Sequence, residues 1–265
     1  MSWTVIRASL WQRRTSLAWY LGGLAFYSWL MVWYWPSIGG SQYKELVESL
    51  PPEMLKMFGG TVVSFGTIGG FFQIEYLGLM WMLIVLSAAF IYASRAFAGE
   101  IADGTMELTL AQPISRATLA VSRVAGLVII SAALSLTTFG TLQLFGAAYD
   151  VKIAAESLCQ LIGLGALFIL AGGGVCMLVS ACVRGGGKAG GIAAGLFALM
   201  WASDIVANVS DVADFFGPVN LVSKWQPGVI MDGGSVEPAT WWLYGIVALV
   251  SLVASVAIFT RRDAA

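Results

Sequence analysis

The chain has 265 residues, of which 58% are hydrophobic and only 11% are charged. Soluble domains usually carry about 25% charged residues, so this composition excludes an ordinary soluble domain and predicts an integral membrane protein. The net charge of −1 and the lack of any basic run of four or more residues argue against nucleic acid as a partner.

The chain contains no histidine. Imidazole serves haem proteins, most zinc sites and the usual serine and cysteine hydrolases, so its absence argues against a membrane enzyme. We expect no catalytic residue, no metal site and no cofactor on this chain. The cysteines have apolar surroundings and no C-x-x-C spacing, and they are interpreted as small buried hydrophobic residues. They are Cys159, Cys176 and Cys182.

Residues 1–15 are predicted to form an amphipathic helix at the membrane interface. Its apolar side would carry Trp3, Val5, Ile6 and Leu10, and its arginines would lie toward the other side. The alternative is a simple basic flank to the first span. The candidate interfacial residues are Arg7, Trp11, Arg13 and Arg14.

Six apolar segments follow, each long enough to cross a hydrocarbon core of about 30 Å. The first is rich in Trp and Tyr, which are typical of membrane interfaces. The expected fold is one all-α transmembrane domain over residues 1–265, with six spans, the interfacial helix and a short cytoplasmic helix. The predicted spans are about residues 16–35, 76–98, 119–147, 156–183, 189–207 and 241–260, and the two long loops are residues 36–75 and 208–240.

Six spans place both termini on one side of the membrane, and the lysines and arginines indicate which side. The other side would carry only Lys44, Lys56, Lys152 and Lys224. By the positive-inside rule, we expect both termini in the cytoplasm and the two long loops outside, in a multi-pass protein of the plasma or inner membrane. The basic residues assigned to the cytoplasm are Arg7, Arg13, Arg14, Arg95, Arg116, Arg123, Arg184, Lys188, Arg261 and Arg262.

The segment 99–116 places acidic residues between two long apolar blocks. Glu100, Asp103 and Glu107 are spaced by three and four residues, which predicts one face of a helical turn. A solvated loop is the alternative.

The residues around these acids favour a short helix over a loop. Asp103 or Thr105 is expected to cap it, and Gly104 permits a sharp bend before it. Pro113 is expected to end the helix before Ser115 starts the next span. The result would be a rigid, acidic helix at the bilayer surface, suited to docking of another protein.

This segment resembles the coupling segment of ABC transporter permeases of the type-2, efflux-associated class. The resemblance lies in Glu100 followed by GTMELTLAQPISR from Gly104, and in outline it extends to the interfacial helix and the six spans. It implies an ATP-driven exporter of a hydrophobic or amphipathic substrate. Carried over, the residues that contact the ATPase would be Glu100, Gly104, Thr105, Glu107, Pro113 and Arg116, with Asp103 beside them.

The resemblance also implies the partners. Two ABC ATPase subunits would bind ATP and magnesium, and a second permease copy or homologue would complete the pathway within the membrane lipids. The loop RGGGK at 184–188 is no phosphate-binding loop of this chain, because Cys182 and Ala189 stand where that motif needs Gly and Ser or Thr.

Two further sets of residues are candidate sites. Gly187, Gly191 and Gly195 repeat every four residues, as in close helix packing, either within one subunit or at a permease dimer seam or pathway wall. Glu75 and Asp204 are candidates for lining a pathway, with a place at the outer interface as the alternative. The run Gly172–Gly174 is interpreted as a flexible point in the fourth span.

Two other functions remain as alternatives. An ion-coupled secondary transporter would work without an ATPase, but it needs titratable groups or broken helices at the bilayer midplane, and the spans are nearly free of charge. A membrane enzyme would need a convergent polar set within the spans.

Overall fold

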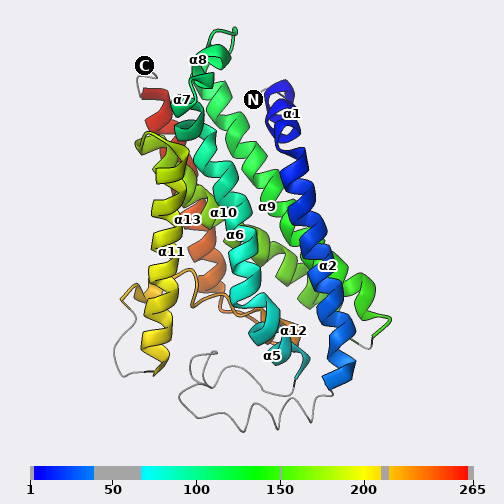
Figure 1. Cartoon of the computed structure of the whole chain (residues 1–265). Coiled ribbons are helices and arrows are strands. Elements are labelled where there is room, and N and C mark those ends of the chain that lie inside the picture. The colour runs from blue at the N-terminus through cyan, green and yellow to red at the C-terminus, as the bar shows by residue number, and fades with distance from the viewer. Residues whose placement is uncertain (1–2, 39–66, 150, 210–214, 262–265) are drawn as a thin grey trace.

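The computed structural model describes residues 3–38, 67–149, 151–209 and 215–261, and these ranges contain helices and no strand. Long helices run side by side between two ends of the bundle (Figure 1). They are α2 (Arg14–Ile38), α6 (Leu79–Ser94), α9 (Arg116–Gly146), α10 (Ala155–Cys182), α11 (Gly186–Val209) and α13 (Pro238–Arg261).

Five helices in the described ranges are long and apolar enough to cross a membrane, whereas the sequence predicts six. They are Leu79–Ala102, Arg116–Gly146, Ala155–Cys182, Gly186–Asn208 and Pro238–Arg261. The remaining long helix, α2, has 25 residues. Its many Trp and Tyr side chains have polar tips and lower its hydropathy, so the first predicted span stays a prediction.

Helix α10 lies at the centre of the bundle and packs against α6, α9, α11 and α13. The run Gly172–Gly174 makes this possible, and its interpretation as a flexible point is wrong. A Cβ at Gly172 would lie 2.6 Å from Leu86, and one at Gly173 would lie 2.8 Å from Leu127. The third glycine faces Ser251 in the same way, at 2.5 Å. The glycines therefore allow close approach to three different helices.

The cysteine prediction is wrong for two of the three residues. Cys176 is buried in α10, but Cys159 and Cys182 are exposed on the surface of that helix. A cysteine on the outer surface of a membrane helix can contact lipid, so its apolar sequence surroundings do not require burial in protein.

One end of the bundle, here called the coupling end, carries α1 (Trp3–Gln12), α7 (Glu100–Ala102), α8 (Thr105–Leu110) and the last turn of α13 (Figure 1). The opposite end, called the distal end, carries the short helices α5 (Ile68–Phe72) and α12 (Pro227–Met231). The described parts of both predicted long loops are therefore partly helical, because a π-helical segment, Gln73–Leu77, also precedes α6 and a 3₁₀ turn, Gly217–Val219, precedes α12.

Side chains fasten the distal segments to each other. Asp232 follows α12, and its two carboxylate oxygens accept from Thr67 Oγ1 at 2.6 Å and from the Gly69 amide at 2.9 Å. The Gly228 amide donates to Gln73 Oε1 at 2.9 Å. Helices α5 and α12 are thus held as one unit at this end.

Candidate functional site

The coupling segment, residues 99–116, forms two short helices instead of the one predicted. Helix α6 continues through a π-helical segment, Arg95–Gly99, into α7, so the chain is helical from Leu79 to Ala102. Gly104 then adopts a left-handed conformation with φ of 69°, and α8 begins at Thr105. The left-handed backbone conformation costs little free energy only for glycine or asparagine, so Gly104 sets the direction of α8.

The expectation that Asp103 or Thr105 caps this helix is wrong. The N-cap of α8 is Gly104, which makes no side-chain cap hydrogen bond. The Thr105 hydroxyl instead donates back to the Glu100 carbonyl at 3.3 Å. The prediction that this helix ends before Ser115 is confirmed, because α8 ends at Leu110. Ser115 then caps α9 by accepting from the Thr118 amide at 3.1 Å.

The three acids do not share one helical face, which corrects the sequence prediction. Glu100 turns into the bundle and accepts at 2.5 Å from Arg123 Nη2 of α9. The exposed Asp103 accepts at 2.9 Å from Arg95 Nη2, at the start of the π-helical segment. Glu107 lies on α8 beyond Gly104 and is exposed. The bend at Gly104 separates these environments.

The ion pair between Glu100 and Arg123 is largely buried, with side chains 13% and 7% exposed. Among the described residues, Glu100 Oε2 and Arg123 Nε have no hydrogen-bond partner. A buried ion pair with unsatisfied atoms adds little net stability, because the loss of hydration offsets the attraction. Its effect here is positional, since it fixes α7 against α9.

A second set of contacts joins the interfacial helix α1 to the same place. The Tyr92 hydroxyl of α6 donates to the Arg123 carbonyl at 3.0 Å and lies 3.5 Å from Ser9 Oγ of α1. Arg13 lies over the Tyr92 ring, 5.2 Å from its centroid, and donates to the Ile91 carbonyl. Helices α1, α6, α7 and α9 therefore meet at one polar cluster, defined here as Ser9, Arg13, Tyr92, Glu100 and Arg123.

The π-helical segment links the coupling segment to α10. Its irregular turn leaves the Ala98 amide to donate to Ser180 Oγ at 2.9 Å, and Ser180 Oγ donates in turn to the Ser94 carbonyl. The Gly185 amide donates to the Ala98 carbonyl at 3.3 Å, just before α11. A displacement of α7 would thus reach α10 and the start of α11 as well as α9.

Helix α8 presents an exposed tip beyond this anchored base. Met106 is buried, while Leu108 is 74% exposed and Glu107 is exposed next to it. Pro113 lies in the exposed turn after α8, and Arg116 is the first residue of α9. The tip of α8 is therefore the part of the coupling segment that another protein could reach.

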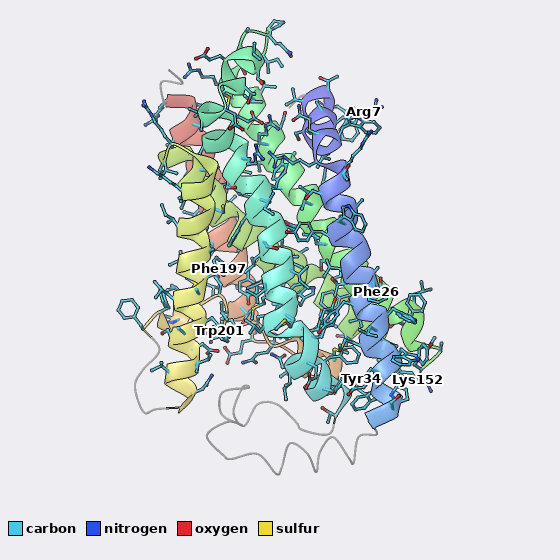
Figure 2. The ribbon with its side chains drawn as sticks, in the orientation of Figure 1. Arg7, Phe26, Tyr34, Lys152, Phe197 and Trp201 are labelled. Carbon is cyan, nitrogen blue, oxygen red and sulfur yellow. The ribbon has the colours of Figure 1, made fainter. Side chains whose placement is uncertain are left out.

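The residues predicted for the interfacial helix point in different directions. Arg7 (Figure 2) and Trp11 are exposed. Arg14 stacks on Trp11 with its guanidinium 3.8 Å from the ring centroid. One prediction needs correction, because Arg13 turns toward the bundle. Trp3 is 66% exposed. Ile6 and Ser9 are the buried residues of α1.

The remaining candidate residues lie elsewhere in the bundle. Around Gly187, Gly191 and Gly195, a Cβ would meet no atom within 4 Å, so these glycines do not pack within the described part of the chain. Glu75 and Asp204 both line a cavity at the distal end. The described residues contain no group of three or more His, Cys, Asp and Glu that could hold a metal ion.

Sequence reasoning missed Arg123, Tyr92 and Ser9 as parts of the site. The signal was present for Arg123, because an arginine more than a turn inside an apolar segment needs a partner, and three acids, Glu100, Asp103 and Glu107, precede it in the coupling segment. Tyr92 and Ser9 carry no such signal, since a tyrosine in an apolar helix and a serine in an amphipathic helix are both ordinary.

The sequence model of a family described as "ABC-2 family transporter protein" matches residues 37–264. This range includes the whole coupling segment and every helix from α5 to α13. No curated protein matches the chain.

Proposed function

Because the chain belongs to the ABC-2 transporter family, we propose that it is the permease subunit of an ATP-driven exporter, coupled to a separate ATPase through residues 99–116. The observation that carries the proposal is the anchored but protruding form of that segment. Glu107 and Leu108 are exposed at its tip, and Glu100 is tied to Arg123 at its base. A push on the tip would move the helices that the base contacts.

The chain's charges support a cytoplasmic position for the coupling end. Among the described basic residues, only Lys152 and Lys224 belong to the distal end (Figure 2). The positive-inside rule then places α1, α7, α8 and both termini in the cytoplasm. The basic residues of the coupling end are Arg7, Arg13, Arg14, Arg95, Arg116, Arg123, Arg184, Lys188 and Arg261.

A sixth span by α2 fits this arrangement. At about 1.5 Å per residue, its 25 residues extend about 37 Å, enough to cross a hydrocarbon core of about 30 Å. In chain order α2 would be the first span, and it runs from the coupling end to the distal end, as a first span with a cytoplasmic start must (Figure 1). Trp19 and Trp33 are exposed along it, where lipid and its interfaces would receive them.

We also assign a second permease copy to the open face of α11. Only 22% of the most apolar 18-residue stretch of α11 is buried against the described part of the chain. Gly187, Gly191 and Gly195 lie on that helix with free space around them. Small residues allow two helix backbones to approach closely in lipid. The complex would then contain two permeases and two ATPase subunits, in the plasma or inner membrane, and a hydrophobic or amphipathic cargo would move between the permeases.

The test is co-purification with an ABC ATPase co-expressed with this chain, together with stimulation of its ATP hydrolysis. Glu107→Lys should lower both by about fivefold or more, since it reverses an exposed charge at the contact. Glu156→Lys, an exposed acid at the distal end of α10, is the matched control and should leave both unchanged. Transport by the permease alone in ATP-free liposomes, driven by an ion gradient, would contradict the proposal.

A further inference from the structure

The outer face of α1 carries tryptophan and arginine side chains in alternation. Trp3, Arg7 and Trp11 follow one another at intervals of four residues, and Arg14 comes three residues later, so the four side chains share one side of the helix. All four are exposed. Figure 2 shows Arg7 on the side of α1 that faces away from α9. These four residues are called the outer stripe here.

No acid in the surrounding helices neutralises the arginines of the outer stripe. Helix α1 packs against α9 and α2, and none of these three helices contains Asp or Glu. Neither Arg7 nor Arg14 forms an ion pair within the described part of the chain. Arg14 is stacked on Trp11, but a stacked guanidinium keeps the N–H donors at its edge free for a ligand. The stripe therefore carries two positive charges that lack a counter-charge in these helices.

Contacts on the inner side of α1 hold the outer stripe in place. Ser9 Oγ lies 3.5 Å from the Tyr92 hydroxyl, and the Arg13 guanidinium lies over the Tyr92 ring. Ile6 is buried on the same inner side. Because α1 is fixed in this way, the stripe is already directed away from the bundle before any ligand binds.

The stripe lies at the level of lipid headgroups if α2 is the first span. Helix α2 begins at Arg14, and its length of about 37 Å exceeds a hydrocarbon core of about 30 Å, so its first turn reaches the headgroup region. Exposed aromatic side chains continue from α1 onto α2, where Trp19 is 79% exposed. Tryptophan is enriched at this level of a bilayer. This continuity favours lipid over a protein partner on the stripe.

From the exposure, charge and level of these residues, we propose that the outer stripe binds the phosphate group of an anionic phospholipid. Arg7 and Arg14 are two helical turns apart, about 10 Å along the axis, and both long side chains reach a phosphate beside Trp11. A guanidinium donates two parallel hydrogen bonds to phosphate oxygens. The inference rests on the proposed function only in placing the coupling end at the cytoplasmic membrane surface. Binding itself requires neither ATP nor an ATPase.

Native mass spectrometry of the purified full chain in detergent micelles tests this site. The chain is titrated with phosphatidylglycerol and, separately, with phosphatidylcholine of the same acyl chains. We expect the first phosphatidylglycerol to bind about twentyfold more tightly, since each arginine near an anionic lipid contributes about fivefold. Arg7→Gln/Arg14→Gln should remove this preference. Arg7→Gln alone should raise the dissociation constant about fivefold, and it provides a second variant if the double one fails to fold.

Arg261→Gln is the matched control, because it removes an exposed arginine at the coupling end on another helix, α13. It should leave the dissociation constant of phosphatidylglycerol unchanged. Equal binding of the two lipids would overturn the inference, as would an unaltered preference in folded Arg7→Gln/Arg14→Gln or an equal loss in Arg261→Gln. Displacement of phosphatidylglycerol by excess inorganic phosphate would overturn lipid as the occupant. No ATPase is present, so the proposed function is tested separately by the Glu107→Lys variant.

Discussion

Arg123 Nη2 of α9 donates to Glu100 Oε1 of α7 at 2.5 Å, in an ion pair that is largely buried at the base of the coupling segment. The same arginine accepts from Tyr92 through its backbone carbonyl, so one residue connects the coupling segment, α6 and, through Ser9 and Arg13, the interfacial helix. Movement of the segment cannot leave these helices in place unless this cluster breaks.

Removing one member of the ion pair should destabilise the protein. Glu100→Gln leaves the Arg123 charge buried without a counter-charge, which should lower the free energy of unfolding in mixed micelles by about 2 kcal/mol. Glu100→Gln combined with Arg123→Gln should cost less than the sum of the two single variants, because no unpaired charge remains. Strict additivity in this double-mutant cycle would show that the two side chains do not interact.

The contact between α6 and α9 requires a glycine at position 126. A Cβ there would lie 2.0 Å from the Tyr92 hydroxyl, so Gly126→Ala should displace Tyr92 and cost about 2 kcal/mol of stability. Gly140→Ala is the matched control on the same helix, where a Cβ meets nothing within 4 Å, and it should change stability by less than about 0.5 kcal/mol. Thermal unfolding of the two variants measures the difference, and equal effects would refute the close approach.

The direction of α8 depends on the positive φ of Gly104. Gly104→Ala should cost about 1 kcal/mol and weaken stimulation of the partner ATPase, because alanine resists the left-handed conformation. Gly104→Asn should retain most of both, since asparagine tolerates that conformation. If alanine and asparagine behaved alike in the ATPase assay, the bend would not matter for coupling.

The open face of α11 gives a prediction about self-association. Gly191→Leu places a bulky side chain on the surface assigned to the second copy, and it should raise the dimer dissociation constant in bilayers about tenfold. Gly245→Leu on α13 is the control, because that glycine also has nothing within 4 Å but lies on another helix. Single-molecule subunit counting in vesicles measures both, and an undiminished dimer in Gly191→Leu would place the interface elsewhere.

Local signals in the sequence were enough to predict most of the helices. The Ser115 cap, the stop at Pro113 and the length of the apolar segments locate α9 to within a few residues of its observed bounds. The prediction failed where contacts between distant residues decide the conformation. Glu100 turns inward because Arg123 lies on another helix, and Arg13 turns inward because the Tyr92 ring lies beside it. Helical spacing alone cannot reveal either contact.

The central claim is that the tip of α8 contacts an ATPase subunit, and site-specific photo-crosslinking tests it most directly. A photoreactive amino acid at Leu108, which is 74% exposed, should crosslink to the co-expressed ATPase. The same amino acid at Trp242, which is 72% exposed near the distal end of α13, should not. Crosslinking of the ATPase at position 242, or none at position 108 in an intact complex, would contradict the claim.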